Sequence, residues 1–490
     1  MLERARPEPA GVQPDGILAF LDSVNEKKIN LHGFMLLKHG KVVAEGYYKP
    51  FNGKLLHRIF FVSKSITSSA IGILIGEGLV SLEDRVINFF PDKLPPDINK
   101  YTAMMNVKHL LTMTTGHPKS MDISVEDWVK SFLNTPPQYT PGTVFAYDTT
   151  GTHTLCAIIQ KVTGMTVLDY LKPRLFELLG ISRIEWESCP LGINKGGNGI
   201  KCTIEDLAKF GLLYLQKGIW KNERILPEGW VELSTANHIN NSNSRTMLDG
   251  LHGYGYQFWR TRKNSYCAFG MGGQFIVVIP DKDAVFVSTA NTLHATDGHQ
   301  MILDSLWETI YPALKEEPLK SDPITYSEIE KRLDGLTLIL PEGHAHSPTE
   351  ERVSGKRFNF EKNHLNYGEC EFIFEGNNSR LSFFRGNEKF DLCFGLNHWI
   401  ISSDPFFGHE SANAATWVDE KTCIIYIELF DTLQMFRLYC HFEDGSLVIQ
   451  FQAIGTMDAN TYEGFLTGFI VTVDHIGNPE GIASCSTFFS

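Results

Sequence analysis

Residues 58–91 read RIFFVSKSITSSAIGILIGEGLVSLEDRVINFFP, and the fold follows from this stretch. Apolar side chains recur within it at positions 62, 66, 70, 73 and 74. This spacing places them on one face of a helix, and Gly76 and Gly78 mark where that helix ends. We therefore predict a largely buried helix that begins near Val62.

Three further segments follow along the chain. They read VKHLLTMTTG at 107–116, PGTVFAYDTTGTHTL at 141–155 and GGNGIKCTIEDLAKFG at 196–211. In order and spacing, these segments and the 58–91 stretch resemble the motifs of the serine β-lactamase and penicillin-binding-protein superfamily, including its class C-like esterases and D-aminopeptidases. The resemblance implies an α/β (α+β) domain of the β-lactamase/transpeptidase type, with an antiparallel sheet and a helical subdomain.

The catalytic serine of that superfamily is missing from this chain. The family chemistry needs a serine three residues before a lysine, because residues i and i+3 share one face of a helix. Lys64 matches the lysine, and Phe61 stands at the nucleophile position. A phenyl ring offers neither a proton nor a lone pair, so acyl transfer by the usual route is impossible there. No other serine in the chain has a lysine three residues later, so we expect the chain to be inactive as written.

The second catalytic element of the superfamily corresponds to Tyr147-Asp148-Thr149. The resemblance makes Tyr147 the tyrosine that shares proton transfer with Lys64. Asp148 and Thr149 stand where Ser-Asn or Asn-Ser is commoner, and we take both as candidate substrate-binding residues.

The third element is a glycine-rich variant, Phe269 to Gln274, just before a predicted strand. We take four of its residues as candidates for substrate binding: Met271, Gly272, Gly273 and Gln274. The glycines would let a backbone N–H approach a substrate carbonyl as half of an oxyanion hole, with residue 61 supplying the other half. A bulge before a hairpin strand explains the glycines equally well. The family's basic residue is absent here, which argues against a penicillin-like carboxylate in the substrate.

The secondary structure around these motifs alternates between strand and helix signals. Apolar runs on either side of His39-Gly40 predict a hairpin, and the turn 280–283 predicts a second one over 274–291. We also predict a strand at 254–259, helices through most of 107–233, and a closing helix at 301–314.

The chain is long enough for two or three domains. We predict a β-lactamase-like domain over 1–318, a charged, proline-bearing linker over 319–335 and an antiparallel β domain over 336–490. Seven short β-rich runs in the last part predict a lipocalin-like barrel or a sandwich. Its aromatic residues, among them Trp399 and Trp417, would line a ligand cup or, as the simpler reading, pack in the core.

The charge and cysteine content of the chain disfavour several classes of binding partner and site. Lys and Arg total 44 against 57 Asp and Glu, and the net charge of −13 disfavours nucleic acid and anionic membranes as partners. Nine scattered cysteines without zinc spacing are typical of reduced thiols, and no apolar run approaches the roughly 20 residues of a membrane helix. The N-terminus lacks the apolar core of a secretory signal. We expect a cytoplasmic protein with a small-molecule amide, ester or peptide substrate and no cofactor or metal.

Three functions remain open at this point. The first is a serine hydrolase that opens an amide or ester bond through an acyl-enzyme, with Phe61 in place of its serine. The second is a natural pseudoenzyme or ligand-binding module that uses the same cleft. The third keeps Lys64 and Tyr147 as a non-covalent acid–base pair for another reaction, such as an isomerisation.

Overall fold

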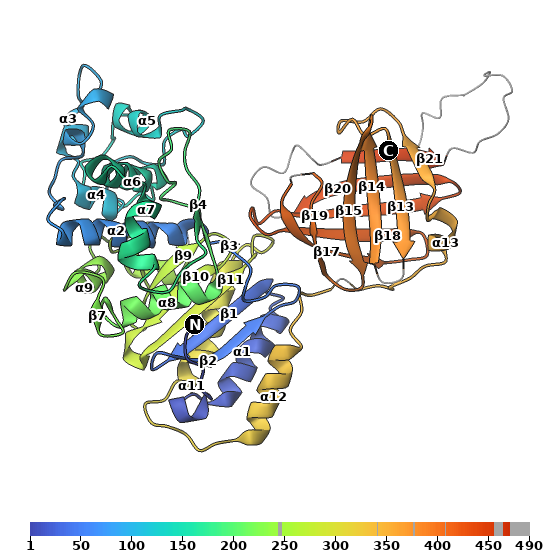
Figure 1. Cartoon of the computed structure of the whole chain (residues 1–490), viewed down its shortest axis with the longest axis horizontal. Coiled ribbons are helices and arrows are strands. Elements are labelled where there is room, and N and C mark those ends of the chain that lie inside the picture. Colours follow the sequence, from blue (N-terminus) through green and yellow to red (C-terminus); the bar gives the residue numbers. More distant parts are fainter. Residues whose placement is uncertain (244–246, 341, 376–377, 407, 455–463, 471–490) are drawn as a thin grey trace. The chain divides into compact units, whose positions relative to one another are not determined.

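The computed structural model describes residues 1–243, 247–340, 342–375, 378–406, 408–454 and 464–470. The chain forms two compact units (Figure 1). The first comprises Met1–Leu340 together with Glu428–Met435, and the second comprises most of the remaining C-terminal residues. A mixed α/β domain and a separate all-β domain were predicted, and both are present.

The first unit is built on an antiparallel sheet with the strand order β2-β1-β11-β10-β9-β8. Its strands are β1 (Leu31–Lys38), β2 (Lys41–Tyr47), β8 (Trp259–Arg260), β9 (Tyr266–Gly270), β10 (Gln274–Ile279) and β11 (Ala284–Ala290). Both predicted hairpins, β1-β2 and β10-β11, are confirmed. Short strands elsewhere in the unit are β3 (His57–Arg58), β4 (Glu185–Trp186), β5 (Ile200–Cys202), β6 (Ile219–Trp220) and β7 (Glu223–Arg224).

The strand predicted at 254–259 is wrong for all but its last residue. The backbone turns at Gln257, whose φ is 64°. The buried Gln257 side chain donates from Nε2 to the carbonyls of Leu110 and Leu111 and accepts at Oε1 from Thr152. These tertiary contacts hold the segment as a loop, although its aromatic residues favour a strand.

Alternate residues of β11 place helices on opposite faces of the sheet. The Phe286 ring lies 5.5 Å from the ring of Phe20 on α1 (Pro14–Glu26). The adjacent Val285 faces α8 (Ile204–Leu215), where a Cβ on Gly211 would lie 2.6 Å from the Val285 side chain. Because successive side chains of a strand point to opposite faces, α1 and α8 cover the two sides of this sheet.

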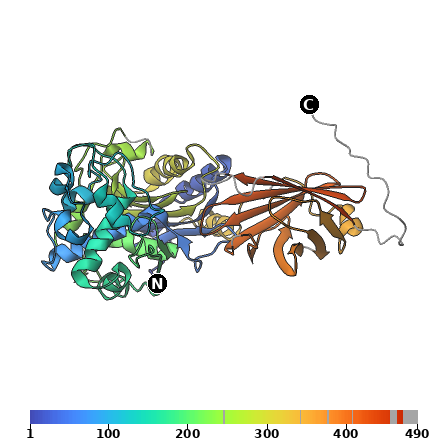
Figure 2. The ribbon, with the colours of Figure 1, turned by 90° about the horizontal axis from the view of Figure 1, so that it is seen from above.

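The predicted helical region forms a subdomain, coloured blue to green in Figures 1 and 2. The helix predicted to begin near Val62 is confirmed as α2 (Ser63–Gly76), which is buried along nearly its whole length. The other helices are α3 (Lys100–Met104), α4 (Val107–Leu111), α5 (Trp128–Asn134), α6 (Thr149–Thr163), α7 (Val167–Leu171) and α9 (Trp230–Thr235). The predicted closing helix is present as α10 (Gly298–Ser305), which continues through a π-helical turn into α11 (Tyr311–Ala313).

The segment 319–335 contains helix α12 (Pro323–Asp334), which packs against α1. Arg332 on this helix pairs with Asp22 on α1 at 2.6 Å. The structure therefore adds a helix to the segment for which a linker is predicted. Among the described residues, no helix is long and apolar enough to cross a membrane.

The second unit is a closed barrel preceded by the short helix α13 (Thr349–Val353). Its strands are β12 (Arg357–Phe360), β13 (Glu369–Glu375), β14 (Asn378–Arg385), β15 (Glu388–Leu396), β16 (Ile400–Ser403), β17 (Glu410–Trp417), β18 (Thr422–Leu429), β19 (Met435–Glu443), β20 (Ser446–Ile454) and β21 (Gly464–Ile470). The parallel pairing of β15 with β17 closes the ring, which decides for a barrel and against a sandwich.

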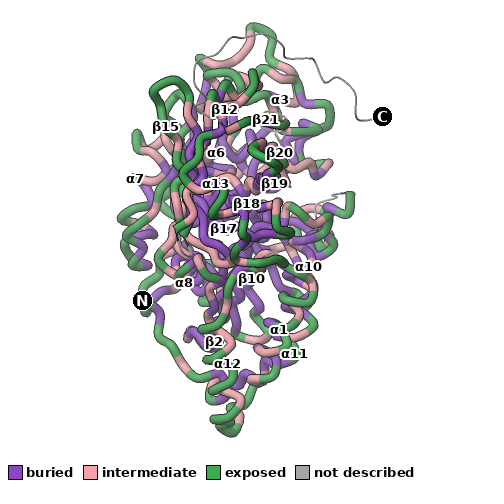
Figure 3. Tube along the Cα trace, turned by 90° about the vertical axis from the view of Figure 1, so that its right-hand side faces the viewer, coloured by how far each residue is buried: buried purple, intermediate pink, exposed green. Residues whose placement is uncertain are grey.

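The seven predicted β-rich runs underestimate the strands of the barrel. One of these predicted runs, DLCFGLNHWIIS at 391–402, divides between β15 and β16, and β17 and β21 lie outside all seven runs. β17 reads ESANAATW, whose small residues have weak strand preference, yet all but its first residue are buried (Figure 3). Trp417 is fully buried at its end and donates from Nε1 to Glu350 Oε1, so it packs in the core.

Candidate active site

Phe61 lies in a single 3₁₀ turn, Phe60–Val62, that leads directly into α2. Phe60 has a left-handed backbone with φ of 46°, an uncommon conformation for a bulky residue and one that clusters at functional sites. A Cβ on Gly270 would lie 2.2 Å from the carbonyl oxygen of Ile59. Only glycine at position 270 therefore lets the end of β9 lie against the turn that carries Phe61.

Lys64 occupies the first turn of α2 and is 1% exposed. Its Nζ donates a hydrogen bond to Thr149 Oγ1 at 2.9 Å. The same nitrogen lies 5.0 Å from the ring centre of Phe61 and 4.8 Å from that of Tyr147. The structure thus brings four of the predicted site residues together: Phe61, Lys64, Tyr147 and Thr149.

Burial sets the protonation of Lys64. Desolvation lowers the pKa of Lys64 to about 7, against a smaller raising effect of the Asp148 carboxylate. A substantial fraction of Lys64 is therefore a neutral amine near pH 7, and a neutral amine can accept a proton.

Tyr147 is held by aromatic contacts on two sides. Its ring stacks on Trp259 at 5.5 Å and meets the edge of the Phe61 ring at 5.8 Å. Burial raises the pKa of Tyr147 well above its usual range, so the phenol keeps its proton at neutral pH. In this arrangement Tyr147 can donate a proton or a hydrogen bond.

Asp148 forms the N-cap of α6 and is fully buried. Its carboxylate accepts from Thr150 N at 2.9 Å, from Thr150 Oγ1 at 2.6 Å and from Thr115 Oγ1 at 3.4 Å. These bonds start the helix at Thr149, whose side chain is partly exposed. The structure therefore places Asp148 behind the site and Thr149 within it.

Met271 to Gln274 connect β9 to β10. Gly272 and Gly273 have φ of 81° and 98°, the left-handed region that favours glycine. Gln274 is 1% exposed, and its Nε2 donates to the carbonyls of Ala290 and Met271 at 2.6 and 3.1 Å. The Gln274 amide thus holds the turn between β9 and β10 in place. Gly270, just before this turn, lies against Ile59, which is two residues before Phe61.

Sequence reasoning assigned no role to Gly197, Trp259 or Ser120, although all three contact the site. A Cβ on Gly197 would lie 2.3 Å from Thr149 Cγ2 and 3.0 Å from Lys64 Nζ. Ser120 Oγ accepts from the backbone N–H of Thr149 at 2.7 Å. The run GGNG at 196–199 was the available signal for the glycine, and nothing local in the sequence marks the other two.

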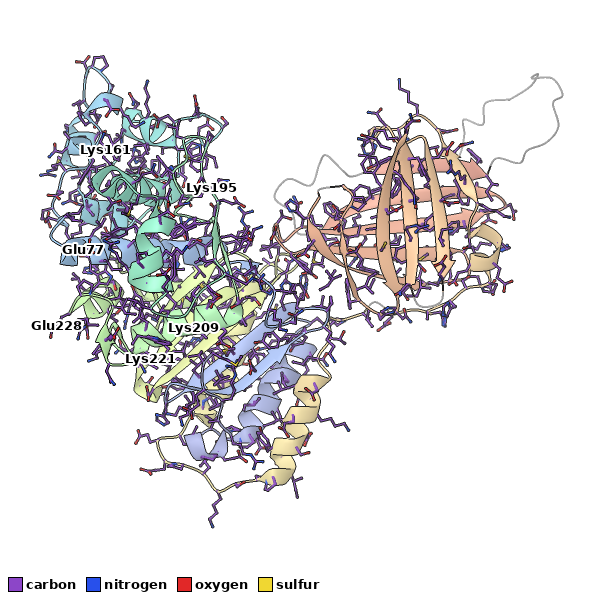
Figure 4. All side chains as sticks on the ribbon, viewed as in Figure 1. Glu77, Lys161, Lys195, Lys209, Lys221 and Glu228 are labelled. Carbon is purple, nitrogen blue, oxygen red and sulfur yellow. The ribbon has the colours of Figure 1, made fainter. Side chains whose placement is uncertain are left out.

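Three histidines near the motifs have contacts that explain their place in the fold. His39 bonds Asp283 beside the hairpin turns, His109 completes the capping box of α4, and His153 lies buried beside Trp128. Lys161 on α6, labelled in Figure 4, is exposed, unlike Lys64. Within the described part of the chain, no three His, Cys, Asp or Glu side chains are grouped to hold a metal ion.

Comparisons with known proteins identify the family of the first unit. The family model for Beta-lactamase matches residues 26–308. The 6-aminohexanoate-dimer hydrolase of Paenarthrobacter ureafaciens is 24% identical over 284 residues, which are 53% of this chain and 72% of that protein. The human mitochondrial serine beta-lactamase-like protein LACTB is 29% identical over 128 residues, 20% of this chain and 23% of that protein.

Among solved structures, SurE superposes with a TM-score of 0.50 at 14% identity, covering 93% of this chain and 98% of that one. At this identity the likeness concerns the fold alone. The family model covers more than half of the chain, and its motifs meet around Lys64. This chain therefore belongs to the Beta-lactamase family.

Proposed function

We propose that the first unit is an acyl-transfer hydrolase of the β-lactamase type, built for an amide or ester bond of a small molecule, in which the route through residue 61 is closed. The observation that carries this proposal is that the centre of the Phe61 ring lies 5.0 Å from the Nζ of Lys64, a buried lysine. Lys64, Tyr147 and Thr149 surround the position where the hydroxyl is missing, which supports this proposal. Lys64 would take the proton of a serine at position 61, and Tyr147 would pass a proton to the leaving group.

Replacement of Phe61 by serine tests this function. We expect F61S to hydrolyse p-nitrophenyl esters, with rates at least about 100-fold above those of F61A, which removes the ring without adding a hydroxyl at position 61. The panel also includes D-amino-acid amides and the 6-aminohexanoate dimer that one relative is named for. A fluorophosphonate should label residue 61 of F61S. A folded F61S protein that is silent with every compound would contradict the proposal.

A non-catalytic binding module is the second candidate, and the packing of Phe61 favours it. The Phe61 and Tyr147 rings meet edge to face at 5.8 Å, which gives the site an aromatic wall where the serine would stand. This function predicts that the unaltered chain binds small amides in calorimetry without consuming them. It also predicts no covalent adduct with a fluorophosphonate or a penicillin, and one adduct would exclude it.

We further infer a cytoplasmic location and a small-molecule substrate. The cysteines among the described residues are free thiols, most of them buried, as is common in a reducing compartment. Cell fractionation tests the location, and recovery from an oxidising compartment would contradict it.

A further inference from the structure

A hydroxyl group, that of Thr149, lies within hydrogen-bonding distance of Lys64. Thr149 Oγ1 accepts the hydrogen bond of Lys64 Nζ at 2.9 Å. When the Lys64 amine is neutral, the same 2.9 Å distance lets the Thr149 hydroxyl donate to Nζ instead, which is the contact that activates a hydroxyl and that residue 61 cannot supply. Among the described residues, Thr149 is the side chain to which Lys64 donates.

The surroundings of Thr149 hold this pair in place. Thr149 is the first residue of α6, and its N–H donates to Ser120 Oγ at 2.7 Å. Gly197 lines the pair on another side, where a Cβ would lie 2.3 Å from Thr149 Cγ2. Thr149 is partly exposed whereas Lys64 is buried, so Thr149 is the member of this pair that lies nearer to solvent.

The charges around Lys64 allow it to act as a base. Asp148 and Cys156 are the titratable groups that act on Lys64 electrostatically, and Tyr147 lies against it. The pKa of Cys156 is raised to about 12 and that of Tyr147 well above its usual range, both by burial, so neither ionises near pH 7. The pKa of Lys64 itself is lowered to about 7. The neutral amine is thus available beside a neutral hydroxyl.

We propose that Thr149 is a second nucleophile of this site, which takes the acyl group of small activated esters when residue 61 carries no hydroxyl. Thr149 Oγ1 attacks the ester carbonyl carbon as its proton passes to Lys64 Nζ. The bond to the leaving alcohol then breaks, and the Lys64 ammonium returns the proton to that oxygen. Water next attacks the threonyl ester; Lys64 takes the water proton and returns it to Oγ1, which releases the acid and restores the site.

This inference rests on the proposed function, because it assigns the same lysine to another hydroxyl. The two can nevertheless fail separately. The proposed function depends on what F61S does at residue 61, whereas the present inference depends on what the unaltered chain does at residue 149.

The primary test uses the unaltered protein with a fluorophosphonate and with p-nitrophenyl acetate. Peptide mapping by mass spectrometry should place the adduct on Thr149, and hydrolysis should rise with pH through an inflection near 7. An adduct on any other residue, or no adduct, overturns the inference.

Variants give the second test. T149V keeps the side-chain shape without the hydroxyl and should lose labelling and hydrolysis by at least about 100-fold, while T149S should retain both. K64M should lose both as well. T163V and K161A, on the same helix but outside the site, serve as matched controls and should behave like the unaltered protein. Equal labelling of T149V and the unaltered protein overturns the inference, and the mapped adduct decides the matter if T149V does not fold.

Discussion

Lys64 and Lys209 are both buried on helices of the first unit, with 1% and 6% exposure, but they have different partners. Lys209 (Figure 4) donates to the carbonyl oxygen of Gly180 at 2.9 Å and to the Asp206 carboxylate at 3.2 Å. Lys64 donates to a hydroxyl and faces two aromatic rings. Burial disfavours an ammonium ion in both places, and only Lys209 has a carboxylate in contact that offsets this cost. The partner of a buried lysine, more than its burial, therefore separates a lysine in an ion pair from one that can act as a base.

The largest expected effect concerns activity. In the F61S background, K64M should reduce ester hydrolysis by at least about 100-fold, because the amine that deprotonates residue 61 is removed. K209M in the same background should lower hydrolysis only in proportion to any loss of folded protein. Steady-state rates corrected for the folded fraction measure the effect of each variant. Equal losses of activity in K64M and K209M would contradict a special role for Lys64.

The next effect concerns the dependence of stability on pH. The folded-state pKa of Lys64 is about 7 against the ordinary 10.5, so between these values the unfolded chain binds the extra proton. The free energy of unfolding of the unaltered protein should therefore rise with pH from 7 to 10.5 relative to that of K64M, by up to about 5 kcal/mol. Urea unfolding at several pH values measures this difference. If the difference in unfolding free energy between the two proteins did not change from pH 7 to 10.5, Lys64 would remain charged in the folded protein.

The two lysines should also differ in what their removal does to stability. K209M leaves the Asp206 carboxylate without its cation and should lower the free energy of unfolding at pH 7 by about 3 kcal/mol. K64M removes an amine that must lose its proton to be buried at this pH, so it should raise the free energy of unfolding, by up to about 4 kcal/mol. Denaturant midpoints of the two variants provide the measurement, and the reverse order would contradict the assignment of roles.

The smallest expected effect is a loss of stability when the space beside the Lys64–Thr149 pair is filled. G197A adds a methyl group 2.3 Å from Thr149 Cγ2 and 3.0 Å from Lys64 Nζ, and should cost about 2 kcal/mol of stability through overpacking. G368A is the control, because the nearest atom to its added carbon lies 4.0 Å away. Thermal unfolding of both variants is the measurement. A G197A protein as stable as G368A would mean that the pair adapts freely.

Much of the first unit was predictable from local patterns. The hairpin β1-β2 and helix α2 follow from apolar periodicity and from the turns that bound them. The meeting of Lys64 with Tyr147 was expected from the order of motifs, and the structure places them together. The loop at Gln257 and the small-residue strand β17 were not predictable, because distant partners decide both conformations.

The sequence by itself determined that the nucleophile position holds a phenylalanine, and that Lys64 and Tyr147 follow it at the family's spacing. Only the tertiary structure decided the state of Lys64. Its partner Thr149 lies 85 residues away along the chain, and its pKa depends on how completely water is excluded around Nζ. Packing sets both the distance and the desolvation, and neither is encoded in the spacing of residues along one helix.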